Sequence, residues 1–203
     1  EIIKIINKEL DSSTLKLVDA NSCYSAKQAI EIGKLLEDNE VIHFEEPCPY
    51  WQPEQTKIVT DSLNLDVTGG EQDCDFRIWK EMIKRKIVNI YQPDVMYMGG
   101  LTRSLKLAEM LNKSGFICTP HAANLSLVTV CTMHFLKAIP NAGNYLEYSI
   151  EGSDYYPWQE NLFYNHPLKI KDGGVIISDE PGWGVVINKE WLNSSKYLIS
   201  ELS

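Results

Sequence analysis

The stretch LKLVDANSCYSAKQAIEIGKLLEDNEVIHFEEP (15–47) decides the fold, because it holds a strand pattern, a helix pattern and a second strand pattern in succession. The short apolar runs at 15–20 and 41–45 are typical of β-strands, and the run at 25–38 between them has the period of an amphipathic helix. A connection of this length is too long for a hairpin. We therefore expect two parallel strands joined by a crossover helix.

The same unit repeats along most of the chain. Further strands are expected at 65–71, 87–92, 115–121 and 145–149, and further helices at 53–63, 75–86, 101–114 and 125–139. This alternation predicts an α/β fold with a parallel sheet. Units that follow at one regular spacing favour a (β/α)8 TIM-type barrel over an open sheet, which would contain a switch point. Because a complete barrel needs about 250 residues, we expect an incomplete barrel made of about the last six βα units.

The pattern changes after about residue 150. The segment that follows is rich in aromatic residues, Pro and Gly and has no helical period before a closing helix expected at 188–202. We therefore predict a partial barrel catalytic domain at 1–150 and a C-terminal tail at 151–203 that packs on the barrel or on a capping region. The chain opens on Glu1 within a helical pattern, which indicates a piece of a longer protein.

Composition excludes several classes of partner. The formal net charge is −9 and no basic stretch has aromatic residues interleaved, so we expect no nucleic-acid partner. No apolar run reaches the roughly 18 residues of a membrane span, so we expect no membrane partner. The five cysteines are scattered without a CxxC pair, which predicts reduced thiols and a cytoplasmic location.

Each expected strand ends on an ionisable side chain. These residues lie 23 to 27 positions apart, and they are Asp19, Glu45, Glu71, Asp94, His121 and Glu147. The carboxyl ends of parallel strands are where the βα loops leave and where barrel enzymes place their chemistry. A regular series of this kind predicts an active site at that edge of the sheet.

Three of these residues form a carboxylate trio. Asp19, Glu45 and Glu71 end neighbouring strands, which lie about 4.8 Å apart, so their side chains can converge. Three carboxylates in one pocket repel each other unless a cation or a proton intervenes. Mg²⁺ prefers such all-oxygen sites, whereas Ca²⁺ is disfavoured by the lack of a glycine-centred ligand loop and Zn²⁺ by the lack of His or Cys in the trio. The competing interpretation is three separate acids that cap the following helices.

The next strand ends pair a carboxylate with an imidazole. Asp94 accepting from one nitrogen of His121 would fix the tautomer and raise the basicity of the other nitrogen, which is the arrangement of a general base. Glu147 follows on the last expected strand. Taken singly, Asp94 could be a turn residue, His121 a buried core histidine and Glu147 a solvent-facing acid.

An ordered set of motifs now identifies a family resemblance. VDAN (18–21), FEEP (44–47), GGEQ (69–72), QPDVMYMGGLT (92–102), PHAAN (120–124), YLEYS (145–149) and EPGWGV (180–185) resemble the enolase superfamily, mandelate racemase and muconate lactonizing enzyme type. The resemblance implies that Asp19, Glu45 and Glu71 bind Mg²⁺ and that Asp94 and His121 act as the catalytic dyad. It further implies that Glu147 stabilises the enolate and that Asn21 contacts the substrate.

The implied chemistry is Mg²⁺-dependent abstraction of the proton α to a carboxylate through an enediolate. We expect a dehydratase that acts on a small acid sugar; the alternative is a racemase or epimerase of a 2-hydroxy or sugar acid. The family's KxK motif on the second barrel strand and its N-terminal capping domain are not in this chain. The truncated chain alone is therefore expected to be inactive, and the full-length form to be a homo-oligomer.

Two other classes of function stay open at this point. A barrel glycosidase would also use paired carboxylates, but without a metal ion and without a role for His121. A barrel kept as a non-catalytic subunit, or an inactive fragment, would bind no Mg²⁺.

Overall fold

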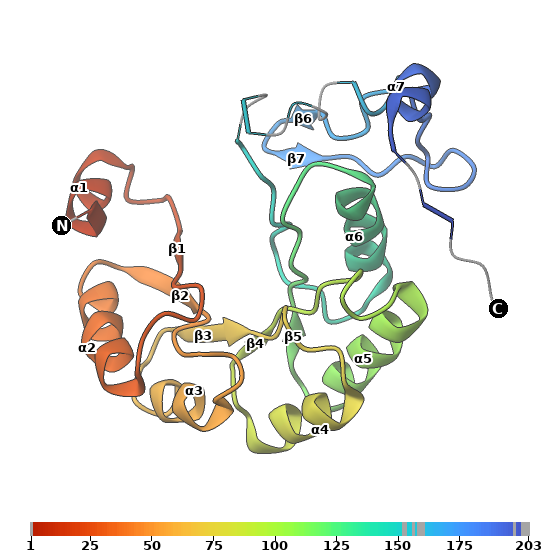
Figure 1. The fold of residues 1–203 in the computed structure, drawn as a ribbon. Helices are drawn as coiled ribbons and strands as arrows, with labels where there is room; N and C mark the ends of the chain where they lie inside the picture. Colours follow the sequence, from red (N-terminus) through yellow and green to blue (C-terminus); the bar gives the residue numbers. More distant parts are fainter. Residues whose placement is uncertain (1, 152–153, 156, 158–160, 197, 200–203) are drawn as a thin grey trace. The chain divides into compact units, whose positions relative to one another are not determined.

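The structure, a computed structural model, describes residues 2–151, 154–155, 157, 161–196 and 198–199 (Figure 1). The chain divides into two compact units. The first unit contains Glu1–His121 and Phe135–Leu146, and the second contains Ala122–His134 and Glu147–Ser203. The predicted domain boundary at residue 150 concerns the catalytic domain of a longer protein and stays a prediction.

The first unit is built on a five-stranded parallel sheet. Its strands follow the chain order β1 (Lys16–Asp19), β2 (Val41–Glu45), β3 (Asp66–Gly69), β4 (Ile90–Tyr91) and β5 (Ile117–Cys118). Every strand pairs in parallel with the next one. The predicted α/β fold with a parallel sheet is therefore confirmed.

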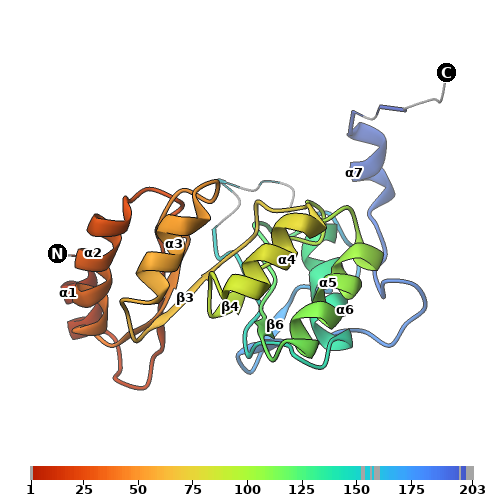
Figure 2. The same ribbon diagram turned by 90° about the horizontal axis from the view of Figure 1, so that it is seen from below.

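Helices connect successive strands along one face of this sheet, as Figures 1 and 2 show. They are α2 (Ala26–Glu37), α3 (Pro53–Thr60), α4 (Phe76–Arg85) and α5 (Leu101–Lys113). Helix α1 (Ile2–Glu9) precedes β1, and α6 (Leu127–Ala138) follows β5 and runs from the second unit into the first. The core of the first unit includes Phe44, Val67, Trp79 and Tyr91, none of which is exposed. Strand side chains of one parity thus face the helices, and those of the other parity reach the opposite face.

Local capping explains where two of the helices begin. Ser25 caps α2 in a capping box with Gln28, and the Asp75 side chain accepts the Arg77 N–H at the start of α4. Both caps satisfy N–H groups that have no partner within the helix. They fix the point at which each βα loop ends, and hence the length of the loop that follows a strand.

The predicted strand at 145–149 does not form. The structure places only an isolated parallel bridge nearby, between Cys118 and Ala142, with Gly143 N–H donating to Cys118 O. Because β5 ends at Cys118, the backbone beyond Gly143 finds no further ladder partner there, and residues 145–149 are irregular. The strand predicted from the alternating pattern of YLEYS was therefore wrong.

The second unit contains the N-terminal part of α6, a short antiparallel hairpin of β6 (Ile170–Lys171) and β7 (Gly174–Val175), and helix α7 (Lys189–Ser194). Its core is a cluster of α6 and tail residues: Val130, Leu162, Phe163, Leu168, Val185 and Trp191. None of the helices in the described part of the chain is long and apolar enough to cross a membrane.

Helix α7 is shorter than the helix predicted at 188–202. It begins at the Asn188 cap, but the backbone of Ser195 is already extended. The hydroxyls of Ser194 and Ser195 both donate to Trp191 O, and such side-chain bonds compete with the helical ladder. Residues 197 and 200–202 of the predicted helix lie outside the described residues.

Candidate active site

The strand register places the predicted carboxylates at one edge of the sheet. Asp19 at the end of β1 pairs with Glu45 at the end of β2, and Glu45 pairs with Thr68 in β3. Glu71 follows two residues after Gly69, where β3 ends. The three acids therefore leave neighbouring strands at the same end, as the sequence predicted.

Each of these carboxylates contacts protein donors. Asp19 accepts the backbone N–H of Asn21 at 2.7 Å and the Asn21 side-chain amide at 3.4 Å. Glu71 accepts from the Gln72 amide at 3.0 Å, and its other oxygen lies 3.5 Å from Nε2 of His121. Asn21, predicted as a substrate contact, is thus placed against Asp19.

Glu45 lies near two further side chains, of which the sequence interpretation missed Gln92. Its Oε2 lies 3.7 Å from Nε2 of His43, and the Gln92 side chain lies close enough to lower the pKa of the Glu45 carboxyl. His43 is held in turn by Thr68, whose hydroxyl lies 2.7 Å from the same ring nitrogen. Strand alternation could have identified Gln92, because it shares a face with Asp94 two residues later.

The electrostatics of the trio are those of crowded acids. Burial raises the pKa of Asp19, and the neighbouring Glu45 adds to that rise. Burial raises the pKa of Glu71 to about 7, offset in part by His121. Burial alone would also raise the pKa of Glu45, but the neighbouring His43 and Gln92 side chains outweigh it and hold that pKa below its usual range.

This donor set fits a hard divalent cation in chemistry. Three carboxylates lie at the ends of adjacent strands, and in the described part of the chain their ion pairs involve histidine only, so no lysine or arginine neutralises them. As the side chains stand, no three acidic, His or Cys groups among the described residues close around one point.

The structure brings Asp94 and His121 into direct contact. Asp94 and His121 face each other across a parallel bridge, and Oδ2 of Asp94 lies 2.8 Å from Nδ1 of His121. The other oxygen of Asp94 accepts the backbone N–H groups of Met96 and Tyr97 at 2.6 and 2.8 Å. Burial would raise the pKa of Asp94, but the bonds from His121 and Tyr97 outweigh it and lower that pKa.

The imidazole of His121 lies between two carboxylates. Nδ1 faces Asp94 and Nε2 faces Glu71, and the residue is only 8% exposed. With Nδ1 engaged by Asp94, Nε2 is the nitrogen directed toward the carboxylate trio. This geometry can move a proton to or from a group held beside the trio.

Tyr97 is a second residue that the sequence interpretation missed. Its ring stacks on the imidazole of His121, with the centroids 6.3 Å apart and an interplanar angle of 27°, and the residue is 55% exposed. The signal was available, since Tyr97 lies three residues after Asp94 in QPDVMYMGG, within one turn of the acid whose oxygen its N–H contacts.

Glu147 belongs to the second unit. Its Oε2 accepts the backbone N–H of Ala122 at 2.6 Å, and Ala122 directly follows His121 in the sequence. The predicted role of Glu147 in the site stays a prediction, because the two units are described separately.

Comparison with known families decides the classification. The chain matches the enolase C-terminal domain-like family over residues 1–191, which is nearly its whole length. The chain belongs to the enolase C-terminal domain-like family. The resemblance found in the sequence motifs, to the mandelate racemase and muconate lactonizing enzyme type, is thereby confirmed.

Relatives of this enolase-family chain include enzymes and solved structures. Arabinonate dehydratase of Saccharolobus solfataricus is 24% identical over 187 residues, which cover 92% of this chain and 48% of that enzyme. A crystal structure from Roseobacter denitrificans, with a provisional racemase assignment, is 56% identical with a TM-score of 0.95 and covers 100% of this chain and 55% of that one.

A further solved structure contains a metal ion. The mandelate racemase/muconate lactonizing protein of Paracoccus denitrificans PD1222, complexed with magnesium, is 26% identical with a TM-score of 0.86. That match covers 95% of this chain and 50% of the Paracoccus chain. The chain thus spans about half the length of the relatives that it matches.

Proposed function

We propose that the full-length protein containing this chain is a Mg²⁺-dependent enzyme that removes the proton α to a carboxylate and forms an enediolate of its substrate. The observation that carries the proposal is the position of His121, with Nδ1 2.8 Å from Asp94 and Nε2 3.5 Å from Glu71. A hydrogen-bonded base thus faces one of three crowded carboxylates. Membership of the enolase C-terminal domain-like family supports the same chemistry.

Each site residue has a proposed role. Asp19, Glu45 and Glu71 would hold Mg²⁺, which supplies positive charge where negative charge builds on the substrate carboxylate. Asp94 keeps Nδ1 of His121 engaged, so that Nε2 accepts the α-proton.

Two further residues complete the proposed site. Asn21, which contacts Asp19, would contact the substrate. Glu147 would stabilise the enediolate.

We propose dehydration of a small acid sugar as the overall reaction. The enediolate would expel its β-hydroxyl, and His121 would return a proton to the leaving oxygen, which yields water and an enol. The enol would then take up a proton at the β-carbon and lose its hydroxyl proton to give the 2-keto acid. Several curated relatives with dehydratase names act on sugar acids, among them arabinonate dehydratase. A racemase or epimerase is the second candidate, and the 56% identical Roseobacter structure with its provisional racemase assignment favours it.

The sheet of the first unit is proposed to be part of an incomplete (β/α)8 barrel. Leu17 in β1, Ile42 in β2 and Ile117 in β5 are 47%, 40% and 46% exposed, and all three line one pocket. Further strands of the full-length protein would cover them. The chain alone would then lack activity, because the second-strand lysine motif and the capping domain of the resemblance lie outside it.

The setting of the full-length protein is also a proposal. All five cysteines of the chain are free thiols, which suits the reducing cytoplasm. A small acid-sugar carboxylate is the proposed partner, and the full-length form is proposed to be a homo-oligomer.

The test is incubation of the full-length protein with a panel of acid sugars and Mg²⁺ in deuterated water. A 2-keto product with loss of water supports a dehydratase, whereas deuterium at the α-carbon without a keto product supports a racemase. Chelation with EDTA should abolish either activity and added Mg²⁺ should restore it. Turnover that persists in EDTA, or no α-proton exchange with any acid, would contradict the proposal.

A further inference from the structure

The loop after β1 and the end of β2 share an unusual backbone conformation. Asn21, Ser22 and Glu46 all have left-handed φ values, of 48°, 62° and 37°. Residues with a side chain rarely adopt such values, and the cost is of order 1–3 kcal/mol per residue unless the surroundings impose it. Something must therefore hold these residues in place.

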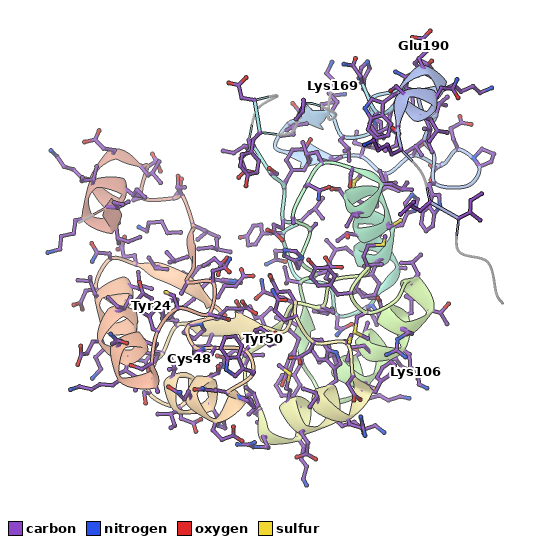
Figure 3. All side chains as sticks on the ribbon, viewed as in Figure 1. Tyr24, Cys48, Tyr50, Lys106, Lys169 and Glu190 are labelled. Atoms are coloured by element: carbon purple, nitrogen blue, oxygen red, sulfur yellow. The ribbon has the colours of Figure 1, made fainter. Side chains whose placement is uncertain are left out.

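Backbone hydrogen bonds join the two segments beyond the ends of their strands. Ala20 N–H donates to Glu45 O at 3.0 Å, Ser22 N–H to Glu46 O at 2.8 Å, and Tyr24 N–H to Pro47 O at 3.1 Å. Figure 3 labels Tyr24 and Cys48, which mark the far ends of the two joined segments. The β1–β2 pairing thus continues through the loops that carry Asp19 and Glu45.

A side-chain bond reinforces the middle of this contact. The hydroxyl of Ser22 donates to Oε2 of Glu46 at 3.0 Å, so Ser22 gives both its backbone and its side-chain donor to the same residue. Glu46 is only 5% exposed, although it is an acid that directly follows Glu45. Glu46 lies just beyond the end of β2 and contacts the loop after β1 through Ser22.

The contact leads to Asp19 through a single residue. Asn21 precedes Ser22 and holds both oxygens of the Asp19 carboxylate, with its backbone N–H and its side-chain amide. If Ser22 shifts, the left-handed turn at Asn21 loses its anchor and the Asp19 carboxylate loses its orientation.

We propose that Glu46 is a positioning residue, which acts through Ser22 and Asn21 to orient the Asp19 carboxylate for Mg²⁺. The inference rests on the proposed metal role of Asp19. Groups that orient metal ligands in this way typically contribute 10- to 100-fold to metal affinity. The sequence FEEP would thus contain one acid that contacts the ion and a second that supports the neighbouring ligand loop.

The proposal predicts that replacing Glu46 affects thermal stability and Mg²⁺ affinity differently. A buried carboxylate with one side-chain hydrogen bond is expensive to keep, so replacing Glu46 with Leu should leave the thermal midpoint unchanged or higher. The same change removes the acceptor for Ser22 and should weaken Mg²⁺ binding. A purely structural residue would instead lower the midpoint and leave the affinity of the folded protein unaltered.

The experiment is calorimetric titration of the full-length protein with Mg²⁺ alone. Ser22→Ala and Glu46→Leu should each raise the Mg²⁺ dissociation constant by about 10- to 100-fold, and the double variant should be no weaker than the weaker single variant. Glu46→Gln should restore most of the affinity, because its amide oxygen still accepts from Ser22.

Thr60→Val is the matched control. The hydroxyl of Thr60 bonds to Ile87 O at 2.6 Å, before β4 begins, and its loss should not change Mg²⁺ affinity. If wild-type protein binds no Mg²⁺, the proposed function fails. If wild type binds and Ser22→Ala and Glu46→Leu bind equally well, the positioning role of Glu46 is overturned while the proposed function stands.

Discussion

Oδ2 of Asp94 lies 2.8 Å from Nδ1 of His121, and the opposite oxygen of the same carboxylate accepts two backbone N–H groups. The carboxylate therefore cannot rotate without losing three hydrogen bonds. Since the turn at Met96 and Tyr97 supplies two of them, the imidazole of His121 is oriented by the loop after β4 as well as by its own segment.

Asp94→Asn should disable the base without disturbing the fold. The amide oxygen of the new side chain can still accept from Met96 and Tyr97, but its NH₂ group would donate toward Nδ1 and favour the wrong tautomer of His121. We expect exchange of the substrate α-proton with deuterated water to slow by about 10²–10⁴-fold, with Mg²⁺ affinity within a few-fold of wild type.

Asp75→Asn is the control for this prediction. Asp75 also accepts a backbone N–H, from Arg77 at 2.8 Å, but it caps α4 and is far more exposed than Asp94. Asn is an equally good cap, so exchange should proceed at the wild-type rate. An Asp94→Asn rate within twofold of this control would contradict the role of the dyad.

The ring of Tyr97, which stacks on His121, should contribute to the rate of α-proton exchange. Tyr97→Ala removes the stacked ring at 6.3 Å while keeping the backbone N–H on Asp94. An aromatic pair contributes about 0.5–1.5 kcal/mol, so we expect kcat for α-proton exchange to fall by about two- to tenfold. Tyr97→Phe should retain the wild-type kcat. Equal losses in both variants would instead assign the effect to the phenol hydroxyl, and no loss in either would reject the prediction.

Gly70 should tolerate no side chain. Its φ is +117°, and a Cβ there would lie 2.5 Å from the ring of Trp79, a residue with no exposed surface. The strained backbone and the overpacked indole together predict a loss of about 2–4 kcal/mol in the free energy of unfolding for Gly70→Ala. Urea denaturation of the full-length protein measures this loss.

Gly115→Ala separates the two causes in this prediction. Gly115 has a φ of +76° but nothing within 4 Å of its Cβ position. Only the backbone cost of about 1–2 kcal/mol should then remain. Equal losses at Gly70 and Gly115 would show that contact with Trp79 adds nothing.

The strands and the ionisable residues at their ends could be predicted from the sequence because both depend on local spacing. Helices between the expected strands imply that the strands are parallel, so their carboxyl ends share one edge of the sheet. Asp19, Glu45 and Glu71 stand at those ends, and their common edge was therefore predictable. The strand expected at 145–149 was not, because a strand needs a partner and β5 ends at Cys118. Alternation alone carries no information about that partner.

The supporting contacts of the site were harder to predict for a different reason. Alternation places Gln92 on the same face as Asp94, but it does not specify that Gln92 approaches Glu45 or that the Tyr97 ring stacks on His121. Ser22 meets Glu46 through left-handed backbone angles that no residue preference favours. Such contacts depend on the assembled loops, whereas the strand-end residues depend on strand parity.

The cysteines should differ sharply in reactivity. Cys23 and Cys74 are exposed, whereas burial raises the pKa of Cys48 to about 11 and that of Cys118 to about 12. Because the thiolate is the reactive form, a raised pKa keeps a thiol protonated at pH 8, and its thiolate fraction grows only as the pH rises toward 11. Iodoacetamide at pH 8, followed by peptide mass spectrometry of the native full-length protein, should label Cys23 and Cys74 at least about 100-fold faster than Cys48 and Cys118. In urea all four should label at similar rates, and fast native labelling of Cys48 would contradict its burial.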